Sequence, residues 1–138
     1  MTDVDREKRL SIAMAELDEF CGIFGFSWEW AYAGGTKTCA STALEIKYPR
    51  GAKNFVVLRE CARRDYRGTG YSPLYSIAER LLSRIKRGVT LAWQWEESRP
   101  AERGRLTVRY TRKYRVPGFA SVAALKIMLA AEGSEFTP

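Results

Sequence analysis

A strand, a glycine-rich turn and a helix follow one another in the middle of this chain, and this order constrains the fold more than any other feature. The run Phe55 to Leu58 is apolar on both faces, as in a strand covered on both sides. Ser72 and Pro73 supply an N-cap and a first-turn proline, and an apolar stripe at helical spacing follows until Gly88. The stripe consists of Leu74, Ile77, Ala78, Leu81, Leu82 and Ile85. The sequence therefore predicts a sheet-and-helix domain.

Two further helices are predicted. The first runs from about Asp5 to Cys21 and is ended by Gly22 and Gly25, and the second covers Ala120 to Ala131. The apolar stripe expected on the first helix is Leu10, Met14, Leu17, Phe20, Cys21 and Phe24.

Alternating side chains predict the remaining strands. They cover Trp28 to Tyr32, Leu44 to Tyr48 and Val89 to Trp95, with the 55–58 run as the inner arm of a hairpin. Residues 96–104 are predicted to form a polar loop. Residues 106–116 alternate as a strand would, although Leu106, Tyr110 and Tyr114 would also align on a helix, and we favour the strand.

These elements predict one domain over residues 1–138 with an α+β (mixed α/β) fold, in which a predominantly antiparallel sheet of about five strands is flanked by three helices. A chain of 138 residues with 46% apolar composition can bury one substantial core. It has no apolar stretch long enough to span a membrane, and its charged amino terminus is unlike a signal sequence. We therefore expect a cytoplasmic protein that does not contact membranes.

The chain contains no histidine, which excludes Ser-His-Asp and Cys-His nucleophile systems and histidine-ligated metals. Its three cysteines, Cys21, Cys39 and Cys61, are odd in number and widely spaced. They support neither a disulfide framework nor a zinc site, so we expect free thiols and no metal.

Charge is distributed unevenly along the chain. The first 29 residues have a net charge of −4 and the rest of the chain has a net charge of +11, which gives the whole chain its net charge of +7. Two basic runs dominate, namely Arg59, Arg63, Arg64 and Arg67, then Arg99, Arg103, Arg105, Arg109, Arg112, Lys113 and Arg115. Such runs attract the phosphates of a nucleotide cofactor, a nucleic acid or a lipid, or form a solvated basic face.

The segment Arg67-Gly68-Thr69-Gly70-Tyr71-Ser72 is built like a phosphate-binding turn. A glycine-rich turn that enters a helix directs free backbone N–H groups and the positive end of the helix dipole at one point, and Arg67 adds a full charge. An anionic ligand is therefore one hypothesis. The alternative is that a basic loop with two glycines simply precedes the helix.

The segment from Ala62 to Leu82 resembles the middle of the GNAT superfamily of acyl-CoA-dependent N-acyltransferases. In that family an R/Q-x-x-G-x-G/A turn leads from a strand into the helix that binds the CoA pyrophosphate, and here Arg67 and Gly70 match it while Ser72 departs from it. Residues 114–119, Tyr114-Arg115-Val116-Pro117-Gly118-Phe119, are similar to the family's Y-x-x-x-G-F ending. The family usually opens with a strand and has a helix where residues 106–116 read as a strand.

The resemblance implies an enzyme with acetyl-CoA as its cofactor. Backbone amides from Gly68 to Ser72 would hold the pyrophosphate, Tyr114 would protonate the CoA thiolate, and Glu60 is the nearest candidate base. A carboxylate suits that step because the attacking amine must lose a proton. The alternative from the residues alone is that Glu60 pairs with Arg59 or Arg63 and that Tyr114 is an ordinary strand aromatic.

A different class of function fits the same composition. A small, non-catalytic basic protein could bind nucleic acid through one ribbon, with arginines on the backbone and tyrosines stacked on bases. The residues for this role are Arg109, Tyr110, Arg112, Lys113, Tyr114 and Arg115. A protein or nucleoprotein partner, such as those bound by small inhibitors of host defence systems, is the third possibility.

Overall fold

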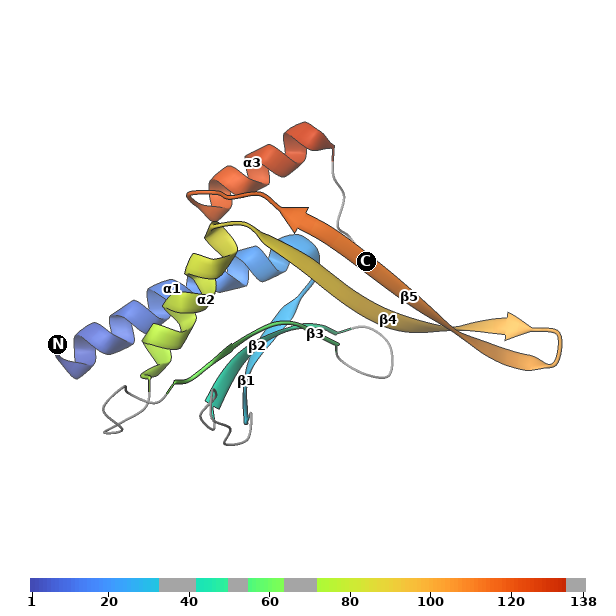
Figure 1. Cartoon of the computed structure of the whole chain (residues 1–138), viewed down its shortest axis with the longest axis horizontal. Helices are drawn as coiled ribbons and strands as arrows, with labels where there is room; N and C mark the ends of the chain where they lie inside the picture. The colour runs from blue at the N-terminus through green and yellow to red at the C-terminus, as the bar shows by residue number, and fades with distance from the viewer. Residues whose placement is uncertain (33–41, 50–54, 64–71, 134–138) are drawn as a thin grey trace.

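The computed structural model describes residues 1–32, 42–49, 55–63 and 72–133. Figure 1 shows three helices, a three-stranded sheet and a long hairpin that projects from the body of the molecule. The fold is α+β, with two antiparallel sheets in place of one sheet of five strands.

The first helix, α1 (Asp3–Phe24), is longer than its apolar stripe indicates. It begins two residues earlier because Thr2 and Asp5 form a capping box, in which each side chain accepts a hydrogen bond from the other residue's backbone N–H. It continues past Gly22, which was expected to end it, and stops at Gly25 in the left-handed conformation. Phe20 and Phe24 are fully buried, so tertiary packing extends the helix by one turn.

The three-stranded sheet has the order β1 (Ser27–Tyr32), β2 (Thr42–Tyr48), β3 (Phe55–Cys61), and both pairings are antiparallel. The central strand is β2, which is buried at five of seven positions. The prediction that the 55–58 run forms the inner arm is therefore wrong, because β2 pairs on both sides and, among the described residues, β3 pairs with β2 alone.

Helix α2 (Leu74–Lys86) connects β3 to the hairpin and packs against α1. Its predicted apolar stripe is confirmed for Ile77, Ala78, Leu81, Leu82 and Ile85, which are buried. Leu74, in the first turn, was predicted to belong to the stripe but is exposed. The predicted N-cap is wrong. Pro73 occupies the cap position without a side-chain bond, and the Ser72 hydroxyl bonds instead to the backbone N–H and carbonyl of Arg63.

The hairpin consists of β4 (Val89–Ala101) and β5 (Gly104–Val116), paired in register from Val89↔Val116 to Ala101↔Gly104. We call it the arm. The preferred strand at 106–116 is confirmed, but the predicted polar loop over 96–104 is wrong, because only the turn at Glu102 and Arg103 separates the strands. A polar, exposed strand lacks the apolar alternation by which strands are recognised, and cross-strand pairing holds it.

Helix α3 (Val122–Glu132) closes the fold over the base of the arm, capped by the Ser121 hydroxyl (Figure 1). Val122, Leu125 and Leu129 bury one side of it against the core. The predicted closing helix is confirmed. Among the described residues, no helix is long and apolar enough to cross a membrane.

A row of aromatic side chains runs from the core onto the arm. Ring centroids lie 5.5 Å apart for Phe24 and Phe26, 5.1 Å for Phe26 and Trp93, and 5.4 Å for Trp95 and Tyr110. Tyr48 on β2 joins the row 5.5 Å from Trp95. Aromatic pairs of this kind contribute about 0.5–1.5 kcal/mol each beyond their buried area. This aromatic row fixes the root of the arm to the body.

Candidate functional site

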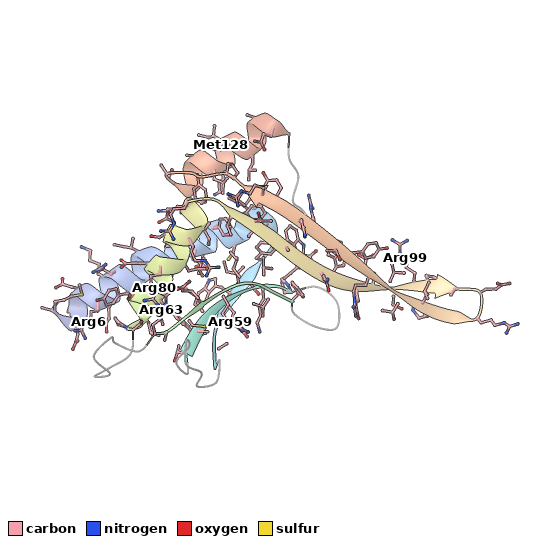
Figure 2. The ribbon with its side chains drawn as sticks, viewed as in Figure 1. Arg6, Arg59, Arg63, Arg80, Arg99 and Met128 are labelled. Carbon is pink, nitrogen blue, oxygen red and sulfur yellow. The ribbon has the colours of Figure 1, made fainter. Side chains whose placement is uncertain are left out.

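Two clusters of basic side chains are candidates for function, one where β3 meets α2 and one on the arm. In Figure 2, Arg59, Arg63 and Arg80 lie beside the helices and the three-stranded sheet, whereas Arg99 lies far out along the arm. The two clusters differ in burial and in partners.

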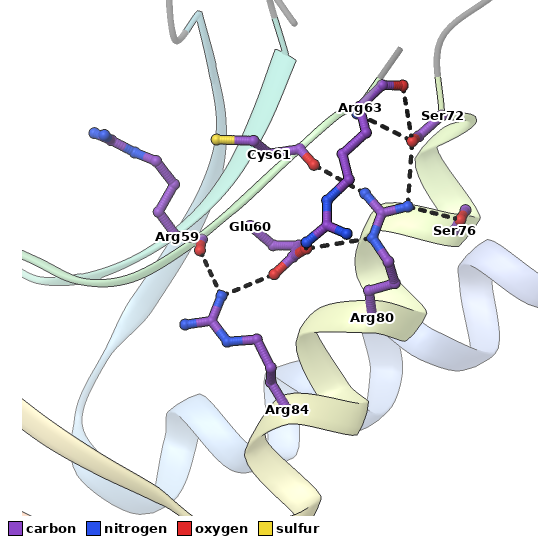
Figure 3. A network of polar contacts seen from close by, with 8 residues as sticks. All are labelled: Arg59, Glu60, Cys61, Arg63, Ser72, Ser76, Arg80 and Arg84. Carbon is purple, nitrogen blue, oxygen red and sulfur yellow. Dashed lines mark hydrogen bonds and ion pairs between the residues drawn. The ribbon is translucent and has the colours of Figure 1, made fainter. Parts of the chain in front are cut away.

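The first cluster surrounds Glu60, whose side chain is only 4% exposed. Its Oε1 atom accepts a hydrogen bond from Arg80 Nε at 3.3 Å, and its Oε2 atom accepts one from Arg84 Nη1 at 2.8 Å (Figure 3). Arg63 Nη2 lies 3.7 Å from Oε1. We call Glu60 with these three arginines the Glu60 network.

Arg80 connects the Glu60 network to the ends of the loop that precedes α2. It donates to the hydroxyls of Ser72 and Ser76 at 3.2 and 3.1 Å and to the carbonyl oxygen of Cys61 at 2.8 Å. Figure 3 shows these bonds converging on one guanidinium between β3 and α2. Because Arg presents five N–H donors in a rigid plane, one side chain can hold the strand end and the helix start together.

Sequence reasoning missed Arg80, Arg84 and the neighbouring Arg87. Ser76, Arg80 and Arg84 are spaced by four residues on α2, so they lie on one helical face beside the apolar stripe. That spacing was the available signal. It did not indicate Glu60 as the partner, because the carboxylate is 20 and 24 residues away from Arg80 and Arg84.

The two residues proposed as catalytic lie in different surroundings. Glu60 is enclosed by guanidinium groups, whereas Tyr114 on β5 packs 6.0 Å from Phe24 and its hydroxyl lies 3.5 Å from Glu132 Oε2. Burial and the Glu132 carboxylate raise the pKa of Tyr114 above its ordinary value. A higher pKa makes the phenol a weaker proton donor.

The turn proposed for a cofactor falls largely outside the described residues, which exclude Arg67, Gly68, Thr69, Gly70 and Tyr71. Ser72 is described. Its backbone N–H donates to the carbonyl of Arg63 at 2.9 Å, and its hydroxyl is engaged by Arg63 and Arg80. The Ser72 amide is therefore already bonded within the protein.

The cysteines also bear on chemistry. Burial, with a contribution from Asp18, raises the pKa of the Cys21 thiol to about 12, so this free and buried cysteine is not a nucleophile at neutral pH. Cys61 is disulfide-bonded, and the expectation of free thiols is wrong for this residue. No group of three or more metal-ligating side chains is present in the part of the chain that the structure describes.

The second cluster lies on the arm, and pairing in register sorts its residues onto two faces. Directly opposed residues of an antiparallel pair point to the same side. Tyr110, Arg112 and Tyr114 share the inner face with Trp95, Trp93 and Leu91, and all three are partly buried. Arg109, Lys113 and Arg115 lie on the outer face, and all three are exposed. The six residues proposed for nucleic acid therefore do not form one surface.

Cations on the outer face have weak partners. Arg109 pairs with Glu96 at 3.0 Å with both side chains substantially exposed, and Arg115 contacts the Thr90 hydroxyl at 3.3 Å. The Lys113 side chain makes no hydrogen bond or ion pair with another described residue. Exposed pairs of this kind contribute roughly 0–1 kcal/mol, so these cations can exchange their partners for a ligand.

The chain matches no protein-family model, no curated protein and no solved structure. These comparisons therefore neither support nor oppose a relationship to the GNAT superfamily.

Proposed function

We propose that the protein binds double-stranded DNA through the outer face of the arm, with Arg109, Lys113 and Arg115 on the phosphate backbone. The observation that carries this proposal is the row of exposed cations with weak partners along one face of a projecting ribbon. Residues 89–116 contain seven cations and three carboxylates, so the arm holds +4 of the total charge of +7. Phosphate contacts from Arg and Lys supply most of the sequence-independent affinity for nucleic acid.

The distribution of aromatic side chains favours a duplex over a single strand. Binding of single strands depends on aromatic rings that are open for base stacking. Here Trp95 stacks on Tyr110 and Tyr114 packs on Phe24, on the face opposite Arg109, Lys113 and Arg115. Cations without open rings on the same face suit a sugar–phosphate backbone.

The shape of the arm favours DNA among duplexes. The major groove of B-form DNA admits a two-stranded β-ribbon, whereas that of A-form RNA is deep and narrow. Paired strands of 13 residues extend roughly 40 Å at about 3.3 Å per residue, longer than one turn of the duplex. The arm can therefore follow a groove while its outer cations face phosphates.

The acyltransferase hypothesis stays a prediction with less support. Glu60 is held by three guanidinium groups that would have to release it before it could accept a proton, and the pKa of Tyr114 is raised. No arrangement of side chains among the described residues favours a small-molecule acyl donor such as acetyl-CoA over another anion.

Fluorescence anisotropy with a short labelled DNA duplex over a range of salt concentrations tests the DNA proposal. We expect the affinity to fall steeply with salt, and the variant R109Q/K113Q/R115Q to reduce the slope of log K against log salt by about 3, since each lost phosphate contact removes about one unit. The matched control R6Q/K8Q/K126Q removes the same charge from exposed positions on α1 and α3 and should keep the slope within about one unit of the parent protein.

Three results would contradict the proposal. They are binding of the duplex that is absent or insensitive to salt, equal loss in the two triple variants, and tighter binding of a single strand of the same length. Circular dichroism and thermal unfolding of both variants establish that the fold is retained.

A further inference from the structure

We propose a second site in this protein: a pocket between β3 and the C-terminal half of α2 that binds a small ligand through a phosphate or diphosphate group. The pocket has a volume of about 310 Å³. Its lining consists of Glu60, Arg63, Arg80, Ser83, Arg84 and Arg87. The inference does not depend on the DNA proposal, because the pocket shares no residue with the arm.

An excess of positive charge is the first argument. Four guanidinium groups and one carboxylate line the pocket, which gives it a net charge of +3. Glu60 has two oxygens, and Arg80, Arg84 and Arg63 already occupy them. Positive charges held close together repel one another more strongly where water is partly excluded. Glu60 neutralises only one of the four guanidinium charges, so a bound anion would reduce the repulsion that remains.

Available donors are the second argument. The Arg63 side chain is 67% exposed and reaches Glu60 only at 3.7 Å. Arg87 is exposed and forms no side-chain hydrogen bond or ion pair with the other described residues, and Ser83 also lines the pocket. The guanidinium groups of Arg63 and Arg87 and the hydroxyl of Ser83 can all donate hydrogen bonds to phosphate oxygens. Arginine can donate two such bonds to one phosphate.

Pre-organisation is the third argument. Arg80 and Arg84 are fixed from several sides, Arg80 by Ser72, Ser76 and Cys61 and Arg84 by the carbonyl of Arg59 at 2.8 Å (Figure 3). Glu60 therefore acts as an internal counter-ion that holds these guanidiniums in place without a ligand. An arginine held in one geometry loses less conformational entropy when it binds.

Position and size define the ligand. The pocket lies beside the C-terminal half of α2 and reaches Arg87, the residue that caps the end of the helix. A helix C-terminus carries a partial charge of roughly −0.5, which is small beside the four full guanidinium charges. A volume at the low end of ligand pockets suits a phosphate or diphosphate group better than a complete large cofactor.

Isothermal titration calorimetry with inorganic pyrophosphate at constant ionic strength tests the site. The variant R63Q/R87Q removes two donors and keeps Arg80 and Arg84 on Glu60. We expect saturable binding to the parent protein and an affinity lower by about tenfold or more in this variant, because each charge-assisted bond contributes substantially. The control R109Q/K113Q removes two cations from the arm and should bind pyrophosphate within about twofold of the parent.

Absence of saturable binding to the parent, or equal loss in both variants, would overturn the proposal. Displacement of pyrophosphate by the DNA duplex would assign the pocket to a backbone phosphate and also overturn a small-ligand site. A thermal unfolding midpoint of R63Q/R87Q close to that of the parent excludes loss of binding through unfolding. The pocket and the arm share no residue, so the protein could bind pyrophosphate even if it does not bind DNA, and the two proposals can fail separately.

Discussion

Two groups of arginines in this protein use the same side chain in opposite ways. In the Glu60 network, the guanidiniums of Arg80 and Arg84 bind one carboxylate that is 4% exposed, and they connect β3 to α2. On the arm, Arg109 pairs with Glu96 at the surface, where both side chains are largely in water. Burial of a single carboxylate decides whether a nearby arginine serves the fold or remains available to a ligand.

The comparison separates charge from function. A count of arginines assigns the two basic runs the same potential for binding phosphate. The structure shows that the first run contributes Arg59 and Arg63, which pair with Glu45 and Glu60, while Arg109, Lys113 and Arg115 on the second line an open face. Arginines that are paired with carboxylates of the same chain should therefore be left out of the count before a basic segment is interpreted as a binding surface.

The largest expected difference between the two regions is in stability. Glu60→Gln should lower the free energy of unfolding by about 3 kcal/mol, the lower end for a broken buried ion pair, because the guanidiniums left behind are partly solvated. The matched change Glu96→Gln breaks the exposed pair with Arg109 and should cost about 0.5 kcal/mol or less. Urea denaturation of both variants measures the two values. Equal losses would show that the Glu60 network is no more structural than a surface pair.

Two glycines give a smaller contrast in backbone strain. Gly88 at the root of the arm and Gly104 at its tip have φ of +98° and +108°, where a side chain is strained. A Cβ at Gly88 would lie 3.3 Å from the carbonyl oxygen of Val116 and from the N atom of Gly118, whereas at Gly104 it would meet no atom within 4 Å. We expect Gly88→Ala to cost about 2 kcal/mol and Gly104→Ala about 1 kcal/mol.

Thermal unfolding of the two alanine variants tests this order. A reversed order would mean that the tip of the arm is packed more tightly than its root, which would remove the distinction between an anchored base and an open end.

A small effect on stability is expected even from removing the whole outer arm. Replacement of residues 98–107 by Asn-Gly joins Glu97 to Val108, a pair already in register, through a favoured two-residue turn. The removed residues Ser98 to Thr107 are all exposed, so the free energy of unfolding should change by about 1 kcal/mol or less. Affinity for the DNA duplex should fall, because Arg99, Arg103 and Arg105 are lost. Loss of the fold would show that the body depends on the whole arm.

Local patterns were sufficient where a segment buries one continuous stripe. The predicted stripe of α2 is buried from Ile77 to Ile85, and the helix ends at Lys86, shortly before Gly88, which bounds the stripe in the sequence. Local patterns failed where long-range contacts decide. The strand at 96–101 has polar and exposed side chains and is held by pairing with residues 104–109, and Glu60 is held by arginines 20 and 24 residues away.

The amino-acid sequence by itself determined three helices, the strands that alternate, the α+β class and the concentration of positive charge after residue 29, because spacing and composition are local properties of a chain. Only the tertiary structure decided that Glu60 is buried among Arg63, Arg80 and Arg84, and that Arg109, Lys113 and Arg115 lie on the face of the projecting arm opposite Tyr110 and Tyr114. The physical reason is that burial and register are set by contacts between segments far apart in sequence, and these contacts determine which charges are neutralised and which remain open to a ligand.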